Sequence, residues 1–377
     1  MKLLWTFSFL IFAISCQNKM QAEESGSTGN SWALLPFEKL DSINPILKPG
    51  INSFYCPIQQ KEVSWEIKNV FNPAGVVRND TLYLLYRAQD SVGQADGTSR
   101  IGLAWSTDGI HFTRYERPVL YPDNDAWKKY EWPGGCEDPR IVEDENGMYY
   151  MTYTAYDGKT ARLCMATSTD LFNWKKQGPV FKGKYEDTWS KSGAIISNFK
   201  EGKIVAEKVN GKYWMYWGDK YIWSATSSDL INWHPVETQE TDTTYDSIYA
   251  GSDISKLKIA LPTRSGKFDC NIVEPGPPAM ITEKGILLLY NGRNLKDCGD
   301  TTLADGTYSA SQVLFDKNDP SKIIERMNGY FLTPEKAYEI VGQVNNVCFI
   351  ESLLYYKNKW WLYYGTADSR IAVAIKE

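Results

Sequence analysis

A short segment rich in aliphatic and aromatic residues recurs five times along the chain. The copies read TLYLLY at 81–86, MYYMTY at 148–153, KYWMYW at 212–217, GILLLY at 285–290 and KWWLYY at 359–364. Each copy follows a pair of residues that favours a turn, such as Asn79-Asp80 or Asn146-Gly147. Aliphatic and aromatic runs bounded by turn residues are typical of β-strands. The pattern therefore predicts five equivalent strands, whose last residues lie 64 to 74 positions apart.

A second motif follows three of these segments. It places an aromatic residue four positions after an Asp and reads STDGIHF at 106–112, STDLFNW at 168–174 and SSDLINW at 227–233. The Asp side chain can close an Asx turn, and the aromatic ring can then pack on a neighbouring strand. The two histidines of the chain, His111 and His234, lie within or beside this motif. We therefore expect both histidines to have structural roles.

Five copies of one strand-and-turn unit predict the fold class. Repeats at this spacing favour an all-β fold, a five-bladed β-propeller with about four strands in each blade. Residues 32–377 are expected to form this single domain. The segment 371–375 would complete a sheet that residues near 44–70 begin, and so close the ring. A β-sandwich is the alternative, and the fivefold repeat disfavours it.

The first residues resemble an export signal. Lys2 is followed by an apolar run from Leu3 to Ile14, which is too short to cross a membrane as a helix. The tetrapeptide that ends at Cys16 resembles a bacterial lipobox. We expect a signal peptide at 1–15, a lipidated Cys16 and a flexible tether over 16–31. The protein would then be exported and anchored in the periplasm, outer membrane or cell surface by its lipid alone; a signal peptide cleaved elsewhere is the alternative.

Composition narrows the chemistry. The net charge of −5 gives no basic surface for nucleic acid, and 43% hydrophobic residues indicate a globular chain. With two histidines and no CxxC pair, the sequence predicts neither a metal site nor a cofactor. An exported chain permits disulfides, although the sequence does not reveal their pairing. Carboxylates are therefore expected to carry proton transfer if the protein is an enzyme.

Charged and amide residues lie beside a strand in each predicted blade. They are Asn72, Arg87, Asp90 and Arg100 in the first blade, Asp138 and Arg140 in the second, Glu207 and Lys208 in the third, Glu274 and Asn291 in the fourth, and Asp368 in the fifth. Such groups are expensive to bury unless they are paired or functional. Because the blades of a propeller meet at a central funnel, we expect these residues to converge there.

Seven short motifs in this set resemble glycoside hydrolase family 130, which comprises β-mannoside hydrolases and phosphorylases. In order they are Asn72-Pro-Ala, Tyr86-Arg-Ala, Ser99-Arg-Ile-Gly, Glu137-Asp-Pro-Arg-Ile, Glu207-Lys, Gly276-Pro-Pro and Asp368. The resemblance implies a five-bladed propeller that acts on an oligosaccharide substrate. It also implies that Asp138 is the catalytic acid and that Asn72, Arg87 and Asp368 hold the sugar in the cleaved subsite. Asp90, Arg100 and Arg140 would support substrate binding.

The resemblance by itself does not distinguish hydrolysis from phosphorolysis. Lys208 matches a phosphate-binding residue of family phosphorylases, whereas Asn291 and Trp217-Gly218 stand where these enzymes carry cationic residues. A site without those charges favours water as the nucleophile. An inverting hydrolase then needs a base, for which Glu274 is the first candidate and Glu207 the second. Asp138 would need a raised pKa to stay protonated near neutral pH.

The sequence therefore predicts an inverting hydrolase that releases mannose from β-1,2- or β-1,4-linked mannosides. The alternatives are a phosphorylase with an altered phosphate site, a non-catalytic glycan-binding lipoprotein, and a five-bladed glycosidase of a clan that acts on furanosides or arabinosides. A stretch rich in Thr, Asp and Tyr from Glu237 to Ser255 would either line the substrate cleft or form a solvated loop. Neither the oligomeric state nor the membrane face is evident.

Overall fold

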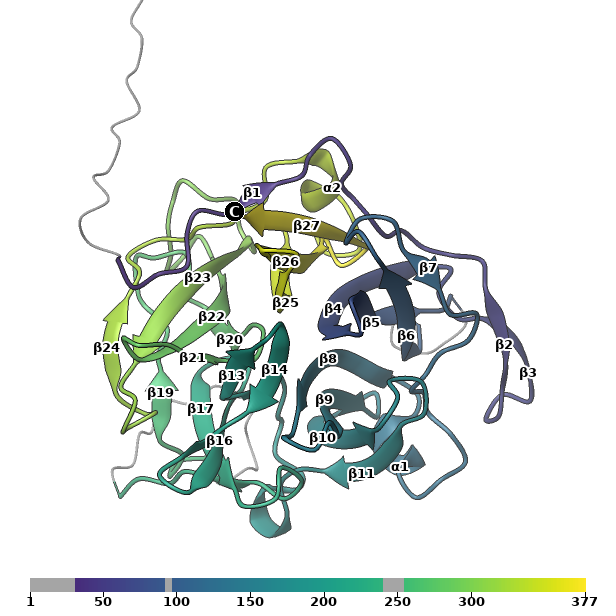
Figure 1. Ribbon diagram of the computed structural model, residues 1–377, viewed down its shortest axis with the longest axis horizontal. Coiled ribbons are helices and arrows are strands. Elements are labelled where there is room, and N and C mark those ends of the chain that lie inside the picture. The colour runs from purple at the N-terminus through teal and green to yellow at the C-terminus, as the bar shows by residue number, and fades with distance from the viewer. Residues whose placement is uncertain (1–30, 92–96, 240–253) are drawn as a thin grey trace, which may run out of the picture. The chain divides into compact units, whose positions relative to one another are not determined.

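The computed structural model describes residues 31–91, 97–239 and 254–377 (Figure 1). Contacts gather residues 32–377 into one compact unit. The expected signal peptide, Cys16 and all but one residue of the expected tether lie outside the described residues, as does most of the stretch from Glu237 to Ser255. Within the described part, no helix is both long and apolar enough to span a bilayer.

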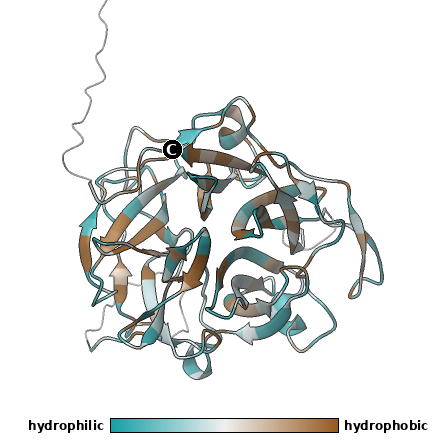
Figure 2. Cartoon of the chain, in the orientation of Figure 1, coloured by the Kyte–Doolittle hydropathy of each residue, from teal (hydrophilic) through white to brown (hydrophobic). Residues whose placement is uncertain are grey.

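Antiparallel strands dominate this unit, which confirms the all-β part of the prediction. Two short α-helices, α1 (Lys128–Glu131) and α2 (Ala337–Ile340), and one 3₁₀ turn at Gly183–Tyr185 are the helical elements of the described residues. Hydropathy follows the strands, with hydrophobic residues along them and many hydrophilic residues in the connections (Figure 2). The strands therefore supply the core, as the aromatic-rich segments predicted.

The main strands form five groups in chain order, arranged around the middle of the view in Figure 1. The first group contains β4 (Asn69–Arg78), β5 (Thr81–Gln89), β6 (Ser99–Ser106) and β7 (Thr113–Arg114). The second contains β8 (Gly135–Glu143), β9 (Tyr149–Tyr156), β10 (Ala161–Ser168) and β11 (Lys175–Pro179). The third contains β12 (Ala194–Ile195), β15 (Lys208–Val209), β16 (Lys212–Trp217), β17 (Ile222–Ser227), β18 (His234–Pro235) and β19 (Ile259–Leu261).

The fourth group contains β20 (Ile272–Pro275), β21 (Met280–Ile281), β22 (Ile286–Arg293), β23 (Tyr308–Phe315) and β24 (Ile323–Arg326). The fifth contains β25 (Cys348–Tyr356), β26 (Lys359–Thr366), β27 (Arg370–Lys376) and the N-terminal β1 (Glu38–Lys39). Two hairpins complete the set: β2 (Ser53–Cys56) with β3 (Lys61–Ser64), and β13 (Ser197–Lys200) with β14 (Lys203–Ala206). Each of the five aromatic-rich segments thus lies in a central strand of its group.

The first and last strands of the unit pair with each other. Glu38 of β1 lies opposite Ile375 of β27, earlier in the chain than the predicted 44–70. From that stretch, Leu47 forms a single bridge to Ile371, and the side-chain amide of Asn44 bonds both the N–H and the C=O of Val373 at 2.9 and 2.8 Å. The side-chain amide of Asn44 thus takes the place of a backbone partner for Val373. Closure into a five-bladed ring stays a prediction.

The repeated turn motif forms as predicted. In each copy one Asp carboxylate oxygen accepts two backbone N–H groups, at 2.8 Å each for Asp108, and at 2.8–3.0 Å for Asp170 and Asp229. The aromatic that follows packs inward: Phe112, which is half-buried, meets Tyr363 edge-on at 6.0 Å, and Trp233 is only 1% exposed. The motif therefore ties each outer turn to a neighbouring strand.

One disulfide, Cys270–Cys298, is present among the described residues. It joins the residues before β20 to those that follow β22, on the two sides of strands whose sequence carries Glu274 and Asn291. Cys56, Cys136, Cys164 and Cys348 are buried free thiols. The bridge was permitted by the expected export, and its pairing became evident only in three dimensions.

Candidate active site

Irregularities in two strand pairs determine the direction of the central polar side chains. The β4–β5 ladder shifts register between Phe71 and Pro73, and the β8–β9 ladder shifts between Glu137 and Arg140. Asn72 and Asp138 are the residues displaced by these bulges, and both have a left-handed backbone with φ of 49°. Non-glycine residues rarely adopt this conformation, and bulges of this kind often redirect a side chain at a functional site.

Asp138 lies at the centre of a buried polar cluster. Its Oδ1 accepts hydrogen bonds from the Asn72 amide at 3.0 Å and from Nη1 of Arg87 at 3.2 Å. Its Oδ2 lies 3.7 Å from Nζ of Lys191. Only 4% of the Asp138 side chain is exposed. Three chain segments that are far apart in the sequence therefore converge on one carboxylate.

Arg87 links Asp138 to a second acid. Its Nη2 donates to Glu137 at 2.7 Å, and its Nε donates to Ser99 at 3.0 Å. Burial alone would lower the pKa of this guanidinium, but the carboxylates of Glu137, Asp138 and Asp368 raise it above its ordinary value. Arg87 thus stays charged and holds both neighbouring acids on one side of β5.

The environment of Asp138 favours its ionised form. Burial raises its pKa, but the charges of Arg87 and Lys191 and the hydrogen bond from Asn72 outweigh burial and lower the pKa to about 2. The expectation of a raised pKa was therefore wrong for the substrate-free protein. The expectation considered desolvation and overlooked the cations that pair with the acid.

Glu274 has the opposite environment. It lies in β20, accepts a hydrogen bond from the Ser192 hydroxyl and is 5% exposed. Burial raises its pKa to about 7; Lys191 opposes this shift and Asp219 adds to it. Burial lowers the pKa of the Lys191 ammonium, but Asp138, Glu274 and the other nearby acids together raise it above its ordinary value. Lys191 therefore interacts electrostatically with Asp138 and Glu274, whose pKa values differ widely.

Asp368 joins the cluster from the turn after β26. Its backbone is also left-handed, with φ of 48°. Burial raises its pKa to about 6, with Arg87 acting in the opposite direction and Asp138 adding to the rise. Next to it, Gly365 leaves room for Asn72, because a Cβ at this glycine would collide with the Asn72 side-chain oxygen. That buried oxygen has no hydrogen-bond partner within the described residues.

Arg140 is buried beside the cluster and connects two chain segments through hydrogen bonds. Its Nε and Nη2 donate to the carbonyl oxygens of Gly276 and Pro275 at 2.7 Å each, and Nη1 donates to the Asp138 carbonyl at 3.3 Å. Nη2 also lies 2.9 Å from Glu351, although the alignment falls short of a hydrogen bond. Burial holds the pKa of Glu351 well above its ordinary value. Arg140 thus fixes the strand of Glu274 against the strand of Asp138.

Comparison with known proteins identifies the family. A family model described as β-1,4-mannooligosaccharide phosphorylase, that of glycoside hydrolase family 130, matches residues 38–377. The chain belongs to glycoside hydrolase family 130. This confirms the resemblance inferred from the ordered motifs. The protein is therefore a carbohydrate-active enzyme of a mannoside-acting family.

Relatives of this family 130 chain span nearly its whole length. A 1,2-β-oligomannan phosphorylase of Thermoanaerobacter sp. (strain X514) is 32% identical over 326 residues, which are 84% of this chain and 92% of the relative. A glycosyl hydrolase of Bacteroides ovatus with a solved structure is 44% identical, with a TM-score of 0.85 over 92% of this chain and 95% of that chain. A third protein, also 44% identical, has a TM-score of 0.86 over 92% of this chain and 95% of its own.

That third structure is described by the statement that the family of mannoside phosphorylases contains glycoside hydrolases that target β-1,2 mannosidic linkages in Candida mannan. Both activities therefore occur among proteins similar to this family 130 chain.

Asp90 and Arg100, which we expected to contact the substrate, instead form an ion pair with each other. The ion pair spans 2.7 Å, and neither side chain is more than 1% exposed. Arg100 also donates to the Thr98 carbonyl at 3.1 Å and lies over the Phe54 ring. Since successive residues of a strand face opposite sides, Arg100 faces away from Ser99, which bonds Arg87. The structure therefore does not bring Asp90 and Arg100 into the cluster.

Three further predicted residues make their side-chain contacts outside the cluster, although the backbone of Asn291 lies opposite Glu274 in the β20–β22 pair. The Asn291 amide is committed to the backbone of Ile350, accepting from its N–H at 2.8 Å and donating to its C=O at 3.0 Å. Glu207 accepts from the Asn198 amide at 2.9 Å, with a third of its side chain exposed. Lys208 is exposed, and its ammonium lies over the ring of Tyr213. These contacts favour packing roles for Asn291 and Glu207 and give Lys208 no anion partner among its described contacts.

Sequence reasoning missed Lys191, Ser192 and Asp219. Lys191 and Ser192 precede Gly193 and the apolar run Ala194–Ile196, and Ser192 has a left-handed backbone with φ of 57°. A lysine beside a buried apolar run was the available signal, but it lay outside the strand repeat that guided the search. Asp219 follows the predicted pair Trp217-Gly218, and its carboxylate accepts from the Trp189 ring at 2.7 Å.

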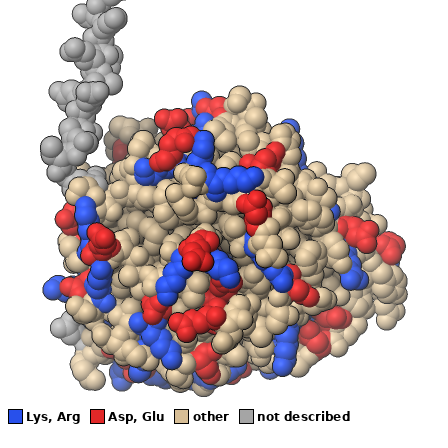
Figure 3. All heavy atoms as spheres, viewed as in Figure 1, with Lys and Arg blue, Asp and Glu red and all other residues tan. Residues whose placement is uncertain are grey.

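Charge is mixed on the molecular surface as well. On the face shown in Figure 3, acidic and basic side chains lie next to each other around a hollow near the middle. This alternation fits the small net charge of −5. It is unlike the single basic stripe of a nucleic-acid-binding face.

Proposed function

We propose that the protein is an inverting glycoside hydrolase that releases mannose from β-mannosides, with β-1,2 linkages as the first choice. The observation that carries this proposal is the buried cluster in which Arg140 bonds the backbone at Asp138 and the backbone just after Glu274, with pKa values of about 2 for Asp138 and about 7 for Glu274. Glycoside hydrolysis needs one protonated and one ionised carboxyl group, and the two environments supply one of each, with the proton initially on the residue assigned as the base. Between these pKa values Glu274 is protonated and Asp138 is ionised.

Asp138 is assigned the acid role, as the family resemblance implies, and Glu274 the base role, as the first of the two candidates from the sequence. In the substrate-free protein the proton resides on Glu274 and the negative charge on Asp138. Protonation of the glycosidic oxygen therefore requires the sugar to take over hydrogen bonds that now stabilise the Asp138 anion. Loss of those bonds raises the pKa of Asp138 and lets the proton move to it, while Glu274 becomes the base that activates water.

The sugar would be held by the groups around Asp138. The unpaired, buried side-chain oxygen of Asn72 is available to accept a bond from a sugar hydroxyl. Arg87 and Asp368 offer a donor and an acceptor within the same cluster. A buried acceptor without a partner is costly, so a ligand hydroxyl there stabilises the complex.

The choice of water over phosphate rests on charge. Arg87 and Lys191 already pair with the acids Glu137 and Asp138. Lys208, which the sequence suggested for phosphate, lies over Tyr213. A phosphate dianion would need free cations, because it would otherwise meet buried carboxylates of the same charge. The proteins described as hydrolases are also more similar, at 44% identity, than the phosphorylase at 32%.

Phosphorolysis is the second candidate, since the curated relatives carry that activity. Product analysis by NMR separates the two. The protein is incubated with β-1,2-mannobiose and, separately, β-1,4-mannobiose, each with and without phosphate. Release of α-mannose in both conditions, lost in Asp138→Asn, is the expected result. Mannose 1-phosphate formed only with phosphate would overturn the hydrolase proposal.

We also propose that the five strand groups form a closed five-bladed propeller, because the first and last strands pair. Export and lipidation at Cys16 remain part of the proposal on the basis of the N-terminal sequence. Metabolic labelling with a palmitate analogue tests the anchor, and a Cys16→Ser variant should lose the label.

A further inference from the structure

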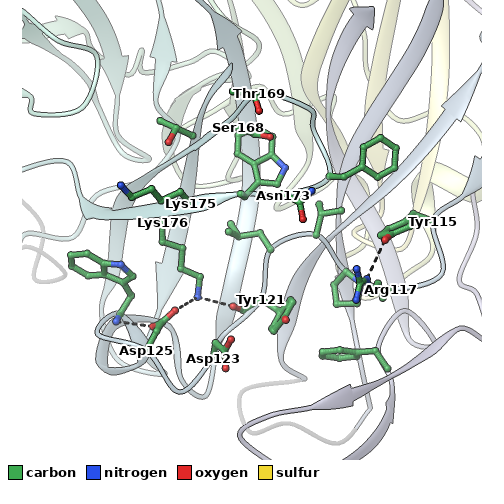
Figure 4. A pocket seen from close by; sticks show the side chains of 18 of the residues that line it. Tyr115, Arg117, Tyr121, Asp123, Asp125, Ser168, Thr169, Asn173, Lys175 and Lys176 are labelled. Atoms are coloured by element: carbon green, nitrogen blue, oxygen red, sulfur yellow. Dashed lines mark hydrogen bonds and ion pairs between the residues drawn. The ribbon is translucent and has the colours of Figure 1, made fainter. Parts of the chain in front are cut away.

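A pocket lies apart from the Asp138–Glu274 cluster, and none of the cluster residues lines it. Its volume is about 960 Å³, within the range of roughly 300–1,000 Å³ that is usual for ligand sites. Three segments enclose it: the β2 strand, the 115–127 connection and the residues from Thr167 to Lys176. Figure 4 shows the side chains that line it.

Aromatic side chains make up much of this lining. Tyr55, Tyr115, Tyr121, Trp127 and Trp174 all border the pocket. Tyr55 is 59% exposed, although it lies in a strand. The other four are half-buried. Exposed and half-buried rings around one cavity offer flat apolar faces to a ligand.

Trp174 is half-buried, as Phe112 is in its own copy of the turn motif. It occupies the position that Phe112 and Trp233 hold in the other two copies of the turn motif. Phe112 packs on Tyr363, and Trp233 is fully covered by the core. Trp174 fixes its ring N–H on the Leu171 carbonyl at 2.8 Å but borders the open pocket. Trp174 therefore serves the turn motif and also presents part of its ring to the pocket.

Polar groups at the pocket are held in place. Lys176 donates to the Tyr121 carbonyl at 2.7 Å and lies 3.1 Å from Asp125 and 2.5 Å from the fully buried Glu131. These contacts fix the 121–125 segment to β11. Asp123, Asn173 and Lys175 add acceptors and donors at the pocket wall (Figure 4). The pocket is thus preformed and combines flat rings with fixed hydrogen-bonding groups.

We propose that this pocket binds a stretch of oligosaccharide outside the catalytic cluster, as an auxiliary glycan-binding site. Sugar rings present an apolar C–H face that packs on an aromatic ring, and hydroxyls at the ring edge that bond to carboxylate and amide groups. The pocket supplies both kinds of group. The choice of sugar, β-mannan, rests on the proposed function. The site would keep a long chain on the enzyme between cleavage events.

Affinity electrophoresis in native gels that contain β-1,2-mannan tests this site. Asp138→Asn is used as the background, so that the polymer is not cleaved. Migration of this protein should be retarded, and Trp174→Ala or Tyr55→Ala should weaken the binding about tenfold or more. Tyr355→Ala is the matched control, because Tyr355 is 39% exposed and lies outside the pocket. Tyr55→Ala remains informative if Trp174→Ala fails to fold.

Mannobiose cleavage by the same variants, with Asp138 restored, separates this proposal from the proposed function. Normal cleavage together with lost retardation supports the auxiliary site. Retardation that is unchanged in both pocket variants overturns the auxiliary site and leaves the function standing. Absence of mannobiose cleavage overturns the function instead. Retardation only in gels of another polysaccharide, or in none, overturns the assignment of the pocket to β-mannan.

Discussion

Replacement of Glu274 by Gln should make the protein both less active and more stable at alkaline pH. Glutamine keeps the shape of the side chain and can still accept the bond from the Ser192 hydroxyl. It cannot take up a proton from water, so the base is lost. General-base catalysis contributes about 10²–10⁴-fold, and kcat should fall by that factor.

The stability change follows from the pKa of Glu274. Its value rises from 4.5 to about 7 on folding, so the folded protein binds more protons than the unfolded chain between these pH values. The free energy of unfolding therefore falls as pH rises through this window. A shift of this size corresponds to about 3 kcal/mol, which the wild type loses between pH 4.5 and pH 8. Glutamine does not titrate and avoids that loss.

Urea denaturation of both proteins at pH 4.5 and pH 8, followed by tryptophan fluorescence, measures the difference. The gain in stability of Glu274→Gln over wild type should be about 3 kcal/mol larger at pH 8. Glu207→Gln is the matched control. Glu207 is bonded to Asn198 on a part-exposed site, so its substitution should leave kcat within about twofold and stability within about 0.5 kcal/mol.

Equal effects of Glu274→Gln at the two pH values would refute the raised pKa. Full activity in Glu274→Gln with loss of activity in Glu207→Gln would transfer the base role to Glu207.

The pH profile of kcat/KM should fall about tenfold per pH unit above about 7, where Glu274 loses the single proton of the pair; a flat profile to pH 9 would contradict this. Lys191→Met should raise the pKa of both Asp138 and Glu274, because the cation near both acids is gone. The alkaline limb of the kcat/KM profile should therefore move upward by about one pH unit. If this limb does not move, Lys191 has no part in the mechanism. Asn291→Ala should lower the free energy of unfolding by about 2–4 kcal/mol, since two buried backbone groups of Ile350 lose their partner. A stable Asn291→Ala variant that no longer binds substrate would instead restore the substrate-binding role.

The strand repeat, the turn chemistry and the family could be inferred from the sequence alone, because each depends on short stretches of neighbouring residues. Aromatic segments bounded by turn residues adopt strands wherever they occur, and an Asp can close the turn within four residues of itself. The acid Asp138 also had a local signal, because its neighbours form a compact motif. Each of these inferences used residues that lie close together in the chain.

Tertiary structure decided which polar residues share a site. Asp138, Lys191 and Glu274 are separated by 53 and 83 positions, and no local pattern shows that one ammonium lies near both acids. The same holds for Asp90, which looked like a ligand residue and instead neutralises Arg100. Charge interactions depend on distance and burial, and both are set only when strands from different groups pack together. The pKa of Asp138 was therefore misjudged from the sequence, although its position in the site was foreseen.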